Sequence, residues 1–177
     1  LAGDICPAIS GRHTHPIAMT VGGFTQYPPQ QALLSLRERL EAARPDVEAT
    51  VELLQGISLP DFERDTEYIA LQKDGEYCFI DGAIASTDGG RWPVDQFKQV
   101  IDEYLVEHST AKHARYQRGA YMVGALARFN LNSAWLHPQA QTAAVALDLQ
   151  TKCTNPFKNT LAQVVEIVHC FESAARI

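Results

Sequence analysis

The sequence has no pair of cysteines at a spacing that binds metals. Its four cysteines, Cys6, Cys78, Cys153 and Cys170, are widely separated, and no C-x-x-C motif occurs. Structural zinc sites use cysteines or histidines at short, regular spacings, and those spacings are missing here. We therefore predict reduced and mostly buried thiols rather than a local thiolate metal site.

Long apolar runs and clusters of positive charge are also missing. No run approaches the roughly 18 apolar residues of a membrane-spanning helix, and no basic segment followed by an apolar one opens the chain. The 15 Lys and Arg residues face 21 Asp and Glu residues, which gives a net charge of -6. No stretch gathers enough positive charge to neutralise a row of phosphates. We expect no membrane span, no nucleic-acid partner and a cytoplasmic location.

The chain does contain enough apolar residues for a core, because 46% of its 177 residues are hydrophobic. Its length fits a single unit over residues 1–177. It starts at Leu1 without a methionine and stops at Ile177 inside an expected helix. These two ends predict a fragment of a larger domain.

Four segments have helical patterns of apolar residues. The first covers residues 33–54, and Pro45 predicts a kink or a break near Arg44. The second covers residues 94–108 after Pro93, with Val94, Phe97, Ile101, Tyr104 and Leu105 on one face. The others cover residues 137–150 and 157–176, the last with Asn155 and Pro156 at its N-terminus.

Strand-like residues flank Asp74-Gly75, the dipeptide that suits a tight hairpin turn, so residues 67–82 predict a β-hairpin. The apolar run over residues 121–126 suits a strand or a buried turn of helix, and we predict a short extended segment. The expected fold is α+β and helix-dominated, with long amphipathic helices packed with a small β-hairpin or sheet.

The segment GRHTHPIAMTVGGF, residues 11–24, has two histidines two positions apart. His13 and His15 are able to reach one metal, but no acidic residue or cysteine lies close by at chelating spacing, so structural histidines are favoured. Gly22 and Gly23 permit backbone conformations closed to other residues, or the close approach of another chain. The segment predicts a shaped loop.

A basic cluster contains Lys112, His113, Arg115 and Arg118. One interpretation is that the cluster contacts an anion or an acidic partner. The other, at least as well supported, is that it forms a solvated basic face. Arg128 follows an apolar run and needs a partner if it is buried. The residues complete no catalytic site, because no G-x-S-x-G motif or converging carboxylate pair occurs.

Four stretches together resemble the large, nickel-bearing subunit of [NiFe] hydrogenases, in the branch that includes the alpha subunits of sulfhydrogenases. They are GRHTHPIAMTVGGF, GEYCFIDGAIASTDGGRWP, HSTAKHARYQRGAYMVGALARFNLN and NPFKNTLAQVVEIVHCFESAARI, and their order and intervals match the middle of that subunit. The resemblance implies a complete enzyme that reversibly oxidises H2 and passes electrons through iron-sulfur clusters to an acceptor such as NAD(P). It also implies that the partner is a small iron-sulfur subunit, with nicotinamide-reducing subunits beside it.

The chain departs from this family at the metal ligands. The family holds its Ni-Fe centre with R-x-C-G-x-C and D-P-C-x-x-C motifs, and neither occurs here. The resemblance therefore implies no catalytic or metal residue in this chain, which alone should bind no cofactor and be inactive.

The resemblance also assigns positions. Arg12 and His15, with Gly22 and Gly23, match a loop that lies close to the small subunit, where His15 would donate a hydrogen bond rather than ligate a metal. Arg128 matches a family position and would help to position the core. Apolar helix faces without their partners should be exposed in the isolated chain.

Two other functions remain open from the sequence. One is a metal-free scaffold related to the quinone-site subunit of respiratory complex I. The other is a free-standing small domain with its own ligand pocket.

Overall fold

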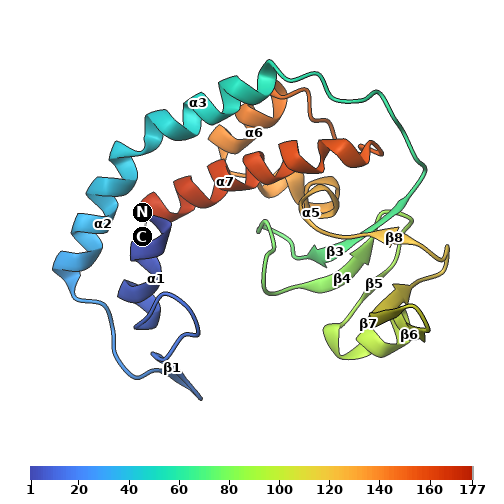
Figure 1. Ribbon diagram of the computed structural model, residues 1–177, viewed down its shortest axis with the longest axis horizontal. Helices are drawn as coiled ribbons and strands as arrows, with labels where there is room; N and C mark the ends of the chain where they lie inside the picture. Colours follow the sequence, from blue (N-terminus) through green and yellow to red (C-terminus); the bar gives the residue numbers. More distant parts are fainter. Residues whose placement is uncertain (177) are drawn as a thin grey trace. The chain divides into compact units, whose positions relative to one another are not determined.

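The computed structural model describes residues 1–176 (Figure 1). These residues form two compact units, the first made of residues 1–50 with the chain from Cys170 onward, the second of residues 51–169. Each unit is described by itself. Their organisation as one unit of a larger domain stays a prediction.

The first unit contains helix α1 (Ala2–Ser10), helix α2 (Gln30–Ala42) and most of helix α3 (Arg44–Gln55). The break between α2 and α3 confirms the prediction from Pro45, which sits in the first turn of α3, where its missing N–H costs no helical hydrogen bond.

Arg44 then ties this break to the end of helix α7 (Asn159–Ala175). Its guanidinium binds Glu41 at 2.9 Å and also pairs with Glu172, and it lies 4.9 Å from the ring centre of Phe171.

The loop between α1 and α2 carries a short antiparallel hairpin of β1 (Met19–Thr20) and β2 (Gly23–Phe24). Val21 and Gly22 form its turn, and Gly22 has φ +88°. Because this φ is in the left-handed region, glycine is the residue that turns here without strain.

The second unit is built on a four-stranded sheet with strand order β5-β4-β3-β8 (Figure 1). The strands are β3 (Glu67–Gln72), β4 (Ala83–Ser86), β5 (Arg91–Trp92) and β8 (Tyr121–Met122). Strands β4 and β3 are antiparallel, whereas β8 runs parallel to β3. A core of Ile69, Ile84, Val100 and Ile101 lies against the sheet.

The predicted hairpin over residues 67–82 is partly wrong. The turn at Asp74-Gly75 forms, with Gly75 at φ +85° and a bridge between Lys73 and Glu76. The strand that returns to β3 is β4, however, because Tyr77 and Cys78 leave the sheet and are buried elsewhere. The chain rejoins the sheet at Gly82, where a Cβ atom would lie 2.8 Å from the carbonyl oxygen of Gln72.

The predicted helix over residues 94–108 is wrong after residue 100. Only the short helices η1 (Val94–Gln96) and α4 (Phe97–Val100) form, and the chain continues as strand β6 (Asp102–Val106), antiparallel to β7 (Ser109–Arg115). Ion pairs across this hairpin join Asp102 to Arg115 at 2.7 Å and Glu103 to Lys112 at 3.5 Å. Such cross-strand pairs stabilise the two strands. The periodicity of apolar residues does not predict them.

The extended segment predicted over residues 121–126 is confirmed for β8 alone, because helix α5 (Ala125–Asn132) begins after Gly124. The two later helices are confirmed as α6 (Pro138–Ala146) and α7. Asn155 accepts a hydrogen bond from the Phe157 backbone N–H at 3.0 Å, as its position before α7 predicts. The expected helix end at Ile177 lies outside the described residues. The fold is α+β and helix-dominated, as predicted.

The cysteines correct one expectation, that the thiols would be mostly buried. Cys78 is fully buried and Cys153 partly so, whereas Cys6 and Cys170 are exposed. Within residues 1–176, no helix combines the length and the hydropathy that crossing a membrane requires.

Candidate functional site

The loop over residues 11–24 is held at its base and exposed at its tip. The backbone N–H of Ala18 donates to the Ser10 carbonyl at 3.1 Å, and the Ala18 carbonyl accepts from the Thr25 N–H at 2.7 Å. Ala18 is buried, whereas Arg12 and His15 are exposed. The fold therefore presents both predicted side chains to solvent on an anchored loop.

His15 has a backbone conformation that few non-glycine residues adopt. Its φ is +57°, which is in the left-handed region. A side chain in that region costs roughly 1–2 kcal/mol relative to the right-handed one. Such residues concentrate at functional positions, where the surrounding structure maintains them.

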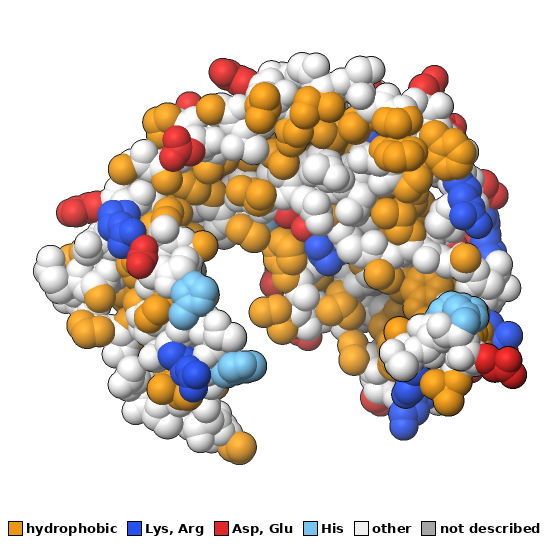
Figure 2. Space-filling view, viewed as in Figure 1, with side chains coloured by type: hydrophobic (Ala, Val, Ile, Leu, Met, Phe, Trp, Pro, Cys, Tyr) orange, Lys and Arg blue, Asp and Glu red, His pale blue; other side chains and the backbone are white. Residues whose placement is uncertain are grey.

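The tip of this loop is apolar. Large exposed apolar side chains occur on both sides of Gly22 and Gly23 in the sequence, namely Ile17, Met19, Val21, Phe24 and Tyr27. A Cβ atom at either glycine would meet nothing within 4 Å in this chain. Hydrophobic, basic and histidine side chains lie close together on the surface of this loop (Figure 2). Space for another chain therefore exists above both glycines.

The described residues do not supply the ligands of a Ni-Fe centre. Among residues 1–176, no three His, Cys, Asp or Glu side chains are grouped so as to hold a metal ion. Cys6 is exposed in the first unit, and the Cys78 thiol in the second unit donates to the Glu76 carbonyl at 3.6 Å. A soft metal centre needs several converging thiolates.

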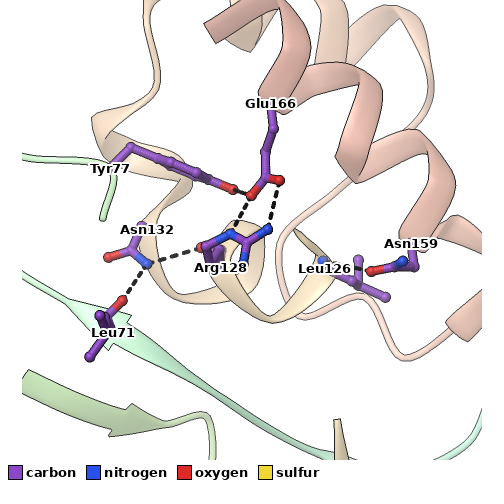
Figure 3. Close-up of polar contacts among 7 residues, drawn as sticks. All are labelled: Leu71, Tyr77, Leu126, Arg128, Asn132, Asn159 and Glu166. Carbon is purple, nitrogen blue, oxygen red and sulfur yellow. Dashed lines mark hydrogen bonds and ion pairs between the residues drawn. The ribbon is translucent and has the colours of Figure 1, made fainter. Parts of the chain in front are cut away.

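Arg128, the predicted site residue of the second unit, lies in a buried polar network (Figure 3). Its Nε donates to Oε1 of Glu166 at 2.6 Å and its Nη2 donates to Oε2 at 2.8 Å. The Tyr77 hydroxyl donates to the same Oε1 at 2.8 Å. Glu166 is 8% exposed, so its charge is compensated within the protein by three donated hydrogen bonds.

Aromatic rings enclose this network. Tyr77 lies 5.1 Å from His169 and 5.4 Å from Phe79, measured between ring centres, and the Arg128 guanidinium lies 5.4 Å from the centre of Phe79. A neighbouring cavity of about 290 Å³ is lined by Arg128, Cys78 and apolar side chains. Arg128 thus joins α5 to α7 beside an apolar cavity.

Two groups that line this cavity have raised pKa values. The hydrogen bonds from Arg128 to Glu166, with the attraction between their charges, raise the pKa of the guanidinium above its ordinary value. Burial raises the pKa of the Cys78 thiol, with a smaller contribution from the charge of Glu76. Arg128 stays charged at all accessible pH values, whereas Cys78 is kept as an unreactive thiol.

Sequence reasoning predicted that Arg128 needs a partner and did not find it. Glu166 lies 38 positions away in α7, inside the apolar sequence LAQVVEIV. An acidic residue within a buried helix face was the available signal. The sequence held no comparable indication that Tyr77 is part of this network, because the predicted hairpin placed it in a strand.

The lysine and the two arginines of the basic cluster are paired within the chain. Arg118 binds Asp65 at 2.9 Å and Asp88 at 2.5 Å, while Lys112 and Arg115 pair with the carboxylates of β6. These pairs favour the solvated face over an open anion site.

Known proteins match this chain over most of its length. It is 33% identical over 168 residues to the alpha subunit of sulfhydrogenase 1 from Pyrococcus furiosus, a match that covers 94% of this chain and 39% of that protein. It is 28% identical over 148 residues to a subunit of the vhu F420-non-reducing hydrogenase from Methanocaldococcus jannaschii, covering 72% of this chain and 34% of that protein. No protein-family model matches the chain.

A solved structure shares the fold. The NAD+-reducing [NiFe]-hydrogenase in its H2-reduced state matches with a TM-score of 0.75 over 98% of this chain and 43% of that one, at 20% identity. These relatives do not favour the quinone-site scaffold. The chain spans about two fifths of the length of its relatives, and this partial coverage fits a central portion. The chain therefore belongs to the family of hydrogenase alpha, or large, subunits and corresponds to a part of one such subunit.

Proposed function

We propose that the chain is the central portion of a [NiFe] hydrogenase alpha subunit, and that the complete protein interconverts H2 with protons and electrons. The 33% identity over 168 residues to the alpha subunit of a sulfhydrogenase carries this proposal. Cysteine motifs outside these 177 residues would hold the Ni-Fe centre. Iron-sulfur clusters of a partner subunit would pass the electrons to an acceptor such as NAD(P), in the cytoplasm.

The apolar surfaces of both units support a place inside a larger assembly. Exposed large apolar side chains occur on most helices, on strand β6 and in several loops, among them Val21, Leu53, Ile80, Leu105 and Val145. Single exposed apolar residues are ordinary, but surfaces of this extent mark interfaces. The partner and the rest of the alpha subunit would cover them.

The loop with Arg12, His15, Gly22 and Gly23 is the proposed contact with the small iron-sulfur subunit. Its exposed apolar tip supplies area to bury, and the open space above the two glycines permits another backbone to approach. The exposed His15 imidazole would donate a hydrogen bond to a group of the small subunit. The Arg12 guanidinium would donate a second, charge-assisted hydrogen bond.

Arg128 has a structural role in this proposal. Because its ion pair with Glu166 joins α5 to α7, it would hold these two helices together. It touches no reacting atom in the described residues and is a positioning residue.

Metal content and H2 oxidation test the proposal together. The complete alpha subunit, produced with its small subunit, should bind about one nickel per heterodimer and reduce a viologen dye under H2. The 177-residue chain alone should hold no nickel in a thiolate site and show no activity.

Two results would contradict the proposal. One nickel per 177-residue chain, held with micromolar or tighter affinity in a thiolate site, would show that the missing cysteine motifs are not needed. A complete gene without either cysteine motif would identify a scaffold instead of an enzyme.

A further inference from the structure

The tip of the β6-β7 hairpin brings two histidines together. His108 lies in the two-residue turn between Val106 and Ser109, and His113 lies opposite Tyr104 on the second strand. Their ring centres are 5.8 Å apart, with the ring planes at 82°. This pair belongs to the second unit and takes no part in the loop or the Arg128 network described above.

Both imidazoles have nitrogens available for a ligand. Within residues 1–176, no hydrogen bond involves either ring, and His108 is exposed. The other histidines of this unit differ, because the Nδ1 atoms of His137 and His169 each accept a backbone N–H. Neutral imidazole nitrogens are common ligands for Zn²⁺, Cu²⁺ and Ni²⁺.

The separation of the two rings suits a shared metal ion. With metal–nitrogen bonds of about 2.0–2.1 Å and tetrahedral geometry, two ligating imidazoles have ring centres roughly 5 Å apart. The observed 5.8 Å exceeds this by less than an ångström. An exposed side chain changes rotamer within nanoseconds, so His108 can close the difference.

The charges around the pair do not oppose a cation. Lys112 and Arg115 are the nearby positive groups, and the carboxylates of Glu103 and Asp102 neutralise them across the hairpin. Glu107 precedes His108 in the turn and adds negative charge. The Tyr104 ring also lies beside His113, with the two ring centres 5.8 Å apart.

We propose that His108 and His113 bind one divalent transition-metal ion at the tip of this hairpin, with water molecules as the remaining ligands. The site offers two imidazole nitrogens and no thiolate. Among the three candidate ions, Cu²⁺ should bind most tightly, because site affinities generally rise to copper and fall again at zinc.

Calorimetric titration of the 177-residue chain with Cu²⁺, Ni²⁺ and Zn²⁺ in chelator-free buffer tests this site. We expect one Cu²⁺ per chain, and a pulsed EPR spectrum that shows coupling to two histidine nitrogens. H108A, at the exposed turn, should weaken Cu²⁺ binding at least fivefold. H113Q keeps a polar side chain on the strand and should have the same effect.

The matched control is the H13A/H15A double variant, which removes the other closely spaced histidine pair of the chain. Its Cu²⁺ affinity should stay within twofold of the parent chain. Absence of binding by the parent chain, a loss smaller than fivefold in folded H108A, or a fivefold loss in the control would each overturn the proposal.

Discussion

Arg128 and Glu166 form a two-point ion pair that joins helices α5 and α7, with nitrogen–oxygen distances of 2.6 and 2.8 Å. Glu166 is almost fully buried, and Arg128 keeps 29% of its side-chain surface exposed. The geometry satisfies both carboxylate oxygens at once, which a lysine with a single ammonium group does not reproduce.

Removing the Arg128 side chain should destabilise the protein strongly. R128A leaves a buried carboxylate without its cation, and this kind of change costs about 3–5 kcal/mol. Urea unfolding measures the free energy. R128K should lose less than R128A, and R37A, at an exposed arginine, should change the free energy of unfolding by less than about 0.5 kcal/mol. Equal stability of R128A and R37A would show that the pair contributes nothing.

Tyr68 offers a test of alkaline stability. Its side chain is 2% exposed, and its hydroxyl has no hydrogen-bond partner within residues 1–176. Burial raises the pKa of Tyr68 above its ordinary value, and the nearby Cys153 adds to this shift. The folded state therefore favours the neutral phenol. The contribution of this group to folding stability is fully present below the unfolded pKa of about 10, and it is lost as the pH rises through the higher pKa of the folded state.

Y68F should accordingly be neutral, or stabilising by up to about 1 kcal/mol, at pH 7, because it removes an unsatisfied buried hydroxyl. It should also lose less stability than the parent chain between pH 10 and 11. Thermal unfolding at both pH values gives the comparison, with Y27F at an exposed tyrosine as control. A loss of more than about 1 kcal/mol at pH 7 would indicate a hydrogen bond that Tyr68 makes in solution.

His15 can be tested without disturbing the loop. Because glycine adopts φ +57° without strain, H15G removes the imidazole and keeps the backbone. In the complete alpha subunit, H15G should weaken small-subunit binding roughly tenfold, the value of one charged or strong hydrogen bond. H13G is the matched control and should change the affinity less than threefold. Equal effects of the two variants would contradict a specific role for His15.

Gly22 and Gly75 form a second matched pair, since both have φ between +85° and +88° and open space where a Cβ would lie. G22A and G75A should each cost about 1 kcal/mol of stability from backbone strain. Only G22A should also weaken small-subunit binding, because Gly22 lies in the proposed interface. Surface plasmon resonance with the complete subunit measures this, and an equal loss for G75A would count against the interface.

Local patterns predicted the elements whose stability is local. Pro45 marked the break between α2 and α3, and Asn155 marked the start of the short 3-10 helix that leads into α7, because both act on the backbone next to them in sequence. Tyr104 and Leu105, in contrast, continued a helical period and are in a strand. The helix was predicted from the spacing of apolar residues alone. The strand forms with ion pairs that this spacing does not report, from Asp102 to Arg115 and from Glu103 to Lys112.

The sequence motifs and the local spacing of residues were enough to predict the family, the helix-dominated α+β class and the lack of paired cysteines. Which side chains meet depended instead on tertiary packing. The folded chain places Glu166 against Arg128 from 38 positions away, and it brings His108 to His113. Glu166 meets Arg128 because distant segments pack together, and His108 meets His113 because the chain forms a hairpin in place of the helix that its spacing predicts.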